Sequence, residues 1–123
     1  MIGYTSLGTN NLDLSAKFYD ELFSLLNVKR LMEVEDFIVW GTDFNTPCFS
    51  IHVPFDGNPA TVGNGVMVAL NATNRETVKA VYHTALELGA SCEGEPGPRG
   101  DTGFYAAYFR DLDGNKLNIH CMS

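Results

Sequence analysis

Basic residues are scarce in this sequence, where 8 Lys and Arg stand against 15 Asp and Glu and the formal net charge is −7. Nucleic-acid backbones and anionic membrane surfaces attract proteins through clustered Lys and Arg, so we expect neither as a partner. Apolar runs such as Val66–Leu70 are far shorter than the roughly 20 residues that span a bilayer. The N-terminal residues also lack the basic and hydrophobic regions of a signal peptide.

Cysteine is equally scarce, with three residues, Cys48, Cys92 and Cys121, and no Cys-x-x-Cys spacing. An odd number without that spacing describes neither a disulfide framework nor a zinc knuckle. Free thiols are typical of a reducing compartment, so we expect a cytoplasmic protein. The simplest interpretation of all three is a small buried or strand residue.

Apolar material is plentiful, because 45% of the 123 residues are hydrophobic. This length and composition favour a single folded domain over residues 1–123. A stretch rich in Pro and Gly at about 54–64 divides it into a first module at about 1–53 and a second at about 65–123.

Both modules have the same predicted order of elements. In the first, we expect strands over 2–8, 29–34, 37–41 and 48–53, and a helix capped by Asn10 or Asn11 that runs to about Leu26. In the second, we expect strands over 65–71, 104–110 and 116–121, a helix that begins after Thr73-Asn74 and ends before Gly89, and a loop over 94–103.

The two modules also align in sequence, which predicts an internal duplication. Tyr4 falls on Met67, and at the same offset Asn11 falls on Asn74. Near the end of each module, Ser50-Ile51-His52 falls on Asn118-Ile119-His120. Because a half of about 60 residues is marginal alone, we expect the halves to pack together or to pair across a dimer.

Two stretches resemble the vicinal oxygen chelate superfamily, which includes glyoxalase I, bleomycin-resistance proteins and extradiol dioxygenases. They are residues 7–19 and 103–117, and the second contains Phe109-Arg110-Asp111-Leu112-Asp113-Gly114-Asn115, which resembles a closing motif of the family. The resemblance covers nearly the whole chain and implies an α+β fold of tandem βαβββ modules, with curved mixed sheets around a concave cavity. Many members are dimers, so it also implies a homodimer. Asp111 and Asn115 can close the last turn by side-chain hydrogen bonds, and Gly114 supplies a positive φ.

The same resemblance implies where metal ligands would stand. It places them at Tyr4 and Met67 on the first strand of each module, and at Ser50 and Asn118 on the last. None of the four is His, Asp or Glu, the residues that bind divalent metals well in this fold. We therefore predict no metal and no other cofactor.

Strand alternation places further polar residues beside these positions. Ser6 shares a face with Tyr4, His52 with Ser50, and His120 with Asn118. We predict His52 and His120 as a general acid/base pair with Tyr4 as a hydrogen-bond donor, and Ser6, Ser50, Met67 and Asn118 as substrate-binding residues. Two alternatives stay open for the histidines, namely a structural role and a displaced metal pair.

Two more candidates for substrate binding come from the second module. Tyr105 lies on a predicted strand rich in aromatics, which either pack in the core or stack on a ligand. Arg99 lies in the loop rich in Gly and Pro, which either connects two strands or forms a lid whose arginine pairs with an anionic substrate.

Three functions fit these observations. The first is a small-molecule-binding protein or metal-independent enzyme of the glyoxalase/bleomycin-resistance type. The second is a metal-dependent lyase that resembles lactoylglutathione lyase and uses a rearranged site. The third is a protein that sequesters a drug or metabolite, for which the acidic charge would attract a cationic compound.

Overall fold

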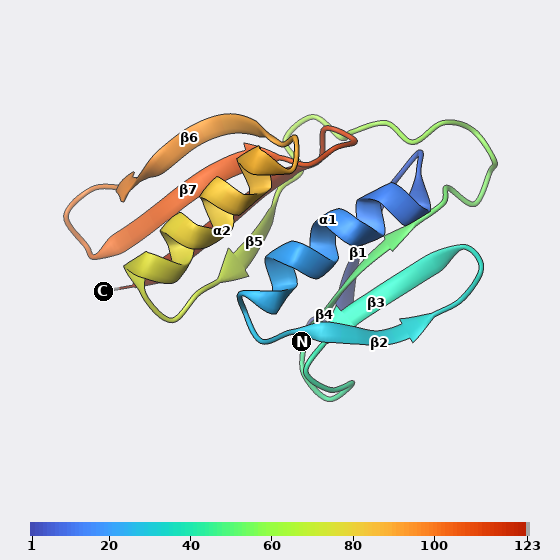
Figure 1. Cartoon of the computed structure of the whole chain (residues 1–123), viewed down its shortest axis with the longest axis horizontal. Helices are drawn as coiled ribbons and strands as arrows, with labels where there is room; N and C mark the ends of the chain where they lie inside the picture. The colour runs from blue at the N-terminus through green and yellow to red at the C-terminus, as the bar shows by residue number, and fades with distance from the viewer. Residues whose placement is uncertain (123) are drawn as a thin grey trace. The chain divides into compact units, whose positions relative to one another are not determined.

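Each half of the chain folds as one helix against one face of a four-stranded sheet in the computed structural model, which describes residues 1–122 (Figure 1). The chain divides into two compact units, Met1–Val62 and a second that begins at Gly63. Neither helix among these residues has the length and apolar character required to cross a membrane.

The first unit consists of β1 (Tyr4–Gly8), α1 (Leu12–Ser24), β2 (Lys29–Glu33), β3 (Phe37–Gly41) and β4 (Cys48–His52). The strand order is β1-β4-β3-β2, with β1 parallel to β4 and the remaining pairs antiparallel. The mixed sheet and the α+β class agree with the sequence prediction.

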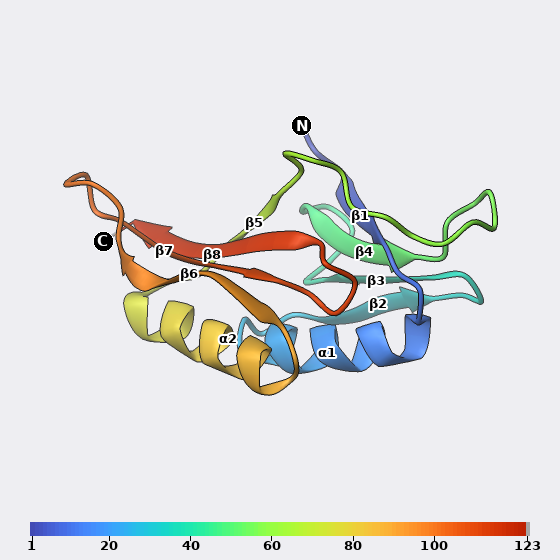
Figure 2. The same ribbon diagram turned by 90° about the horizontal axis from the view of Figure 1, so that it is seen from above.

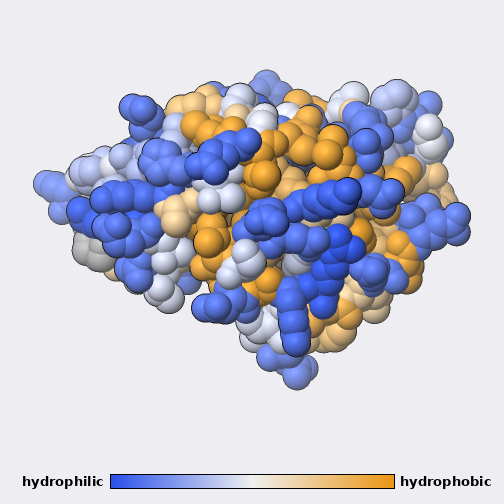
Figure 3. Space-filling model, in the orientation of Figure 1, coloured by the Kyte–Doolittle hydropathy of each residue, from blue (hydrophilic) through white to orange (hydrophobic). Residues whose placement is uncertain are grey.

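Helix α1 begins and ends where local chemistry requires it. The Asn11 side chain accepts a hydrogen bond of 3.1 Å from the Leu14 amide, and Asp13 lies in the first turn, where the helix dipole favours a negative charge. The helix ends at Ser24, earlier than the predicted Leu26, because Asn27 adopts a left-handed conformation with φ of 58°. Hydrophilic residues lie over the outward side of α1 (Figure 3).

An aromatic cluster holds α1 to its sheet. The Tyr19 and Phe49 rings are 4.7 Å apart, the Phe23 and Phe49 rings are 5.1 Å apart, and the Trp40 side chain packs against both helix aromatics. The core of this unit therefore lies on the sheet face that carries Trp40 and Phe49. By alternation, the residues between them along each strand point to the opposite face.

A polar network ties the same elements together at the edge of this core. The Asp20 carboxylate on α1 accepts hydrogen bonds from Arg30 Nε at 2.9 Å, from Arg30 Nη2 at 2.7 Å and from Trp40 Nε1 at 2.9 Å. Partial burial alone would raise the pKa of Asp20, but these three donors lower it below its ordinary value. The network fixes α1 against β2 and β3.

The second unit consists of β5 (Val68–Asn71), α2 (Arg75–Glu87), β6 (Ser91–Pro98), β7 (Phe104–Arg110) and β8 (Lys116–Met122). Its strand order, β5-β8-β7-β6, repeats that of the first unit. The register repeats as well, since Gly8 pairs with His52 as Asn71 pairs with His120. The common order and register support the predicted internal duplication.

Local signals in the second unit also act as predicted. Asn74 caps α2 by accepting a hydrogen bond of 2.8 Å from the Thr77 amide, and Gly89 follows the helix with φ of 109°. In the last turn, Asp111 Oδ1 accepts 2.9 Å hydrogen bonds from the amides of Asp113 and Asn115. On α2, a hydrogen bond with Cys92 and burial raise the pKa of Tyr82 to about 12.

One prediction is wrong, because the loop expected over 94–103 begins as strand β6, which runs from Ser91 to Pro98. Among residues 1–122, β6 pairs only with β7, and its register shifts between Cys92 and Gly94 and again between Gly94 and Gly97. An edge strand with bulges tolerates Pro96 and Pro98, since their missing amides interrupt no second partner. The Gly and Pro content thus marks an edge strand as well as a turn.

Candidate functional site

Each sheet carries its helix on one face only, as Figure 2 shows for α1 on the first sheet and α2 on the second. On the face of the first sheet opposite α1, a groove has a volume of about 460 Å³. We call it the first-sheet groove, and it is lined by Gly3, Tyr4, Ser6, Met32, Phe37, Val39, Phe44, Cys48, Ser50 and His52.

The strand register arranges these residues in rows. Tyr4 pairs with Cys48 at one end of the groove. Ser6, Ser50 and Val39 form the middle row, and His52 with Phe37 forms the row at the other end. The groove therefore runs along β4, with one imidazole at one end and one thiol at the other.

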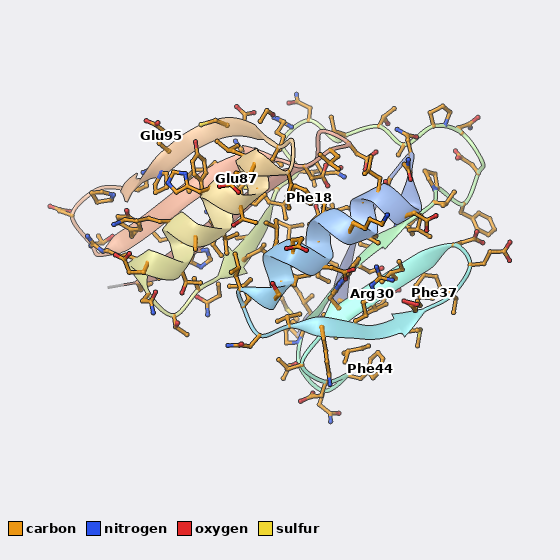
Figure 4. All side chains as sticks on the ribbon, viewed as in Figure 1. Phe18, Arg30, Phe37, Phe44, Glu87 and Glu95 are labelled. Atoms are coloured by element: carbon orange, nitrogen blue, oxygen red, sulfur yellow. The ribbon has the colours of Figure 1, made fainter. Side chains whose placement is uncertain are left out.

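Most of the wall is apolar and accessible. Phe37 comes from β3, and Phe44 projects from the loop that follows it (Figure 4). Tyr4 is 66% exposed, Phe44 62% and Met32 41%. Exposed large hydrophobic side chains that gather around a hollow are typical of binding sites, whereas isolated ones are common on any surface.

The polar side of the groove is a short chain of hydrogen bonds. The His52 Nδ1 atom lies 2.6 Å from Ser6 Oγ, Ser6 donates to Ser50 Oγ at 3.3 Å, and Ser50 donates to the Ile51 carbonyl at 3.4 Å. A hydroxyl has one proton, so Ser6 cannot also donate to His52. With Ser6 donating to Ser50, this arrangement requires the proton on Nδ1 and leaves Nε2 of the neutral ring as an acceptor.

The lining of the groove carries no permanently charged side chain. Its described residues include no Lys, Arg, Asp or Glu. The net charge of −7 of the chain is thus carried outside this wall. A charged ligand group would find no Lys, Arg, Asp or Glu partner among the lining residues.

The second sheet carries a related but different arrangement on its own face. His120 Nδ1 lies 2.8 Å from Asn118 Oδ1, and the His120 and Phe104 rings are 5.3 Å apart. Ala69 stands at the position of Ser6, since it pairs with Asn118 as Ser6 pairs with Ser50. The amide oxygen can only accept, so this histidine also carries its proton on Nδ1.

Six of the predicted site residues fall into two groups. Tyr4, Ser6, Ser50 and His52 meet in the first-sheet groove, and Asn118 and His120 meet on the second sheet. Met67 lies just before β5 and is 42% exposed.

The other two predicted site residues, Tyr105 and Arg99, also belong to the second unit. Tyr105 pairs with Cys121 rather than with His120 or Asn118, and its ring lies 4.6 Å from the guanidinium of Arg75 on α2. Arg99 turns back on its own hairpin, donating to the carbonyls of Gly97 at 2.8 Å and Glu95 at 2.7 Å. Tyr105 therefore lies on the sheet face opposite Asn118 and His120. Arg99 lies on the same face as these two residues, since its guanidinium is 5.4 Å from the ring of Tyr108, which pairs with Asn118.

Sequence reasoning missed most of the apolar wall. Val39 could have been found, because alternation places it with Phe37 and opposite the core residue Trp40. Met32 follows a register shift in β2, and Phe44 lies in a loop. Neither position has a periodic pattern that would have identified it.

The four positions that the resemblance gives for metal ligands do not fit a divalent metal. Tyr4, Ser50, Met67 and Asn118 offer a phenol, a hydroxyl, a thioether and an amide, none of which supplies an imidazole nitrogen or a carboxylate oxygen. Within residues 1–122, no three His, Cys, Asp or Glu side chains gather into a group that could hold a metal ion. We therefore derive no step through a metal.

Comparison with known proteins gives the family. The sequence profile of the Glyoxalase/Bleomycin resistance protein/Dioxygenase superfamily matches residues 1–119. This chain belongs to that superfamily. A crystal structure of a superfamily member, a glyoxalase/bleomycin resistance protein from Albidiferax ferrireducens T118, is 31% identical, with a TM-score of 0.91, and the match covers 100% of this chain and 99% of that one.

More distant superfamily structures show the fold alone. A glyoxalase/bleomycin resistance protein/dioxygenase family enzyme from Burkholderia phytofirmans PsJN is 14% identical over 98% of both chains, with a TM-score of 0.77. A lactoylglutathione lyase from Agrobacterium tumefaciens is 16% identical over 98% of this chain and 92% of that one, with a TM-score of 0.68. No curated protein matches the chain.

Proposed function

We propose that this superfamily member binds a small, mostly hydrophobic molecule in the first-sheet groove without a metal, and that His52 accepts a proton at the polar end of that site. The observation that carries the proposal is an uncharged apolar groove ending at a histidine whose tautomer is fixed by Ser6.

Size and chemistry both support binding. A volume of about 460 Å³ lies within the usual range of small-molecule pockets, which are mainly apolar with a few placed polar groups. The exposed Tyr4, Phe44 and Met32 side chains would lose contact with water when a ligand covers them. Removing apolar surface from water is the main driving force for such binding.

Proton transfer is the chemistry that His52 can supply. A ligand O–H, N–H or activated C–H would give its proton to Nε2, and the imidazolium would then hold protons on both nitrogens. Ser6 Oγ accepts the hydrogen bond from Nδ1–H and so stabilises that cation. The Tyr4 hydroxyl at the far row is the candidate donor to a second polar group of the ligand.

Metal-dependent lyase chemistry is the less favoured function, because the donor set lacks imidazole and carboxylate at the four positions. Turnover of the methylglyoxal–glutathione hemithioacetal with added Ni²⁺ or Zn²⁺ would establish it. Sequestration would use the same groove and would show saturable binding with no product.

The proposal is tested with Nile red, an uncharged hydrophobic dye, in buffer containing EDTA. We expect saturable binding to the metal-free protein and a several-fold loss of affinity in Phe44→Ala. Phe55→Ala is the matched control, because Phe55 is fully exposed and does not line the groove. Equal binding by the two variants, or binding that appears only after a metal is added, would contradict the proposal.

A further inference from the structure

The geometry of the first-sheet groove points to one class of ligand. We infer that the ligand is uncharged, has a hydrophobic body, and carries a hydroxyl or N–H group that donates a hydrogen bond to His52 Nε2. This inference rests on the proposed function and adds to it the charge and the hydrogen-bonding polarity of the ligand.

The exclusion of charge follows from the lining. No Lys or Arg among the described lining residues can pair with a carboxylate or phosphate, and no Asp or Glu can pair with an ammonium group. Taking an ion out of water without a partner is far more costly than burying a neutral group. Anionic conjugates, including those of glutathione, are therefore poor candidates for this site.

The requirement for a donor follows from the direction of the hydrogen bonds. The series of hydrogen bonds ends at the Ile51 carbonyl, which can only accept. Ser50 therefore donates to Ile51, Ser6 donates to Ser50, and His52 donates to Ser6. The imidazole ring of His52 makes no other hydrogen bond in the described part of the chain. A ligand that forms a hydrogen bond with Nε2 of this ring must therefore be the donor.

The rows set the length of the hydrophobic body. Successive rows are two residues apart along β4, so Cys48 and His52 are about 13 Å apart at the usual strand rise. Phe37 lies beside the donor end of the ligand, and Tyr4 beside the far end. Two fused or linked rings fit within this length.

Three naphthalenes test the inference by isothermal titration calorimetry. 2-Naphthol carries a donor, 2-methoxynaphthalene keeps the oxygen but lacks the proton, and 2-naphthoate is an anion. We expect 2-naphthol to bind about five-fold more tightly than the methyl ether, the value of one neutral hydrogen bond, and about ten-fold or more tightly than the anion.

Two variants assign the preference to His52. In His52→Phe the naphthol and its ether should bind equally, whereas the exposed His83→Phe control on α2 should keep the wild-type ratio. Ser6→Ala provides a second test if His52→Phe does not fold. It should reduce the ratio of the 2-naphthol affinity to the 2-methoxynaphthalene affinity. Equal affinities in the wild type, or tightest binding of the anion, would overturn the inference and leave the binding proposal standing. If none of the three compounds binds, both are overturned.

Discussion

Replacing Ser6 with Ala should change the protonation pattern of His52 before any ligand is known. Ser6 Oγ lies 2.6 Å from His52 Nδ1 and is the only hydrogen-bond partner of that ring within residues 1–122. The serine therefore selects the tautomer with the proton on Nδ1. Alanine has no acceptor, so the proton is free to occupy Nε2.

The magnitude follows from the single bond that is removed. A neutral hydrogen bond stabilises by about 1 kcal/mol, which corresponds to a roughly five-fold change in the ratio of the two tautomers. Ser50 keeps its hydrogen bond to the Ile51 carbonyl, so the variant loses little else. We expect the free energy of unfolding to fall by no more than about 1 kcal/mol.

Long-range ¹H–¹⁵N NMR spectra of the imidazole rings provide the assay, because protonated and unprotonated ring nitrogens have different ¹⁵N shifts. His120 is an internal control, since its proton is held by Asn118 and should not respond. Ser24→Ala is the matched variant, because Ser24 Oγ bonds to the Glu21 carbonyl outside the groove. A wild-type His52 protonated at Nε2, or a ratio unchanged by Ser6→Ala, would refute the reasoning.

Two further predictions concern the rest of the fold. Asp20→Asn should lower the free energy of unfolding in urea at pH 7 by about 1 kcal/mol, a value reduced for partial exposure of the Asp20–Arg30 pair. Because the folded-state pKa of Asp20 is lowered, this contribution is complete above the ordinary value of 3.8 and disappears as the pH falls below it, so a pH-independent difference would contradict the network. The exposed Asp36→Asn is its control. In an alkaline absorbance titration, Tyr82 should ionise near 12, and Cys92→Ala should lower that value; no change on substitution would show that Cys92 is not the cause.

The fold was largely predictable because its determinants are local. Asn11 and Asn74 mark the two helix starts, and Gly114 marks the last turn. The edge strand β6 was not predictable in the same way. Pro96 and Pro98 break a helix or a central strand, but at a bulged sheet edge they cost no ladder hydrogen bond, and only the pairing with β7 shows that they lie at such an edge.

The site was half predictable for a related reason. Alternation along one strand says that Ser50 and His52 share a face, and the pairing of β1 with β4 then brings Ser6 beside them. Alternation does not say which face the helix covers. Tyr105 pairs with Cys121 on the side of α2, a fact that depends on the register with β8 and on a helix distant in sequence.

The most direct test of metal-free binding in the first-sheet groove is an amide chemical-shift titration of the ¹⁵N-labelled protein with 2-naphthol in EDTA. The account predicts saturable shifts that centre on Ser6, Val39 and Ser50 of the middle row and on His52 of the end row. Shifts confined to residues outside the groove, or shifts that appear only when a divalent metal replaces EDTA, would contradict it.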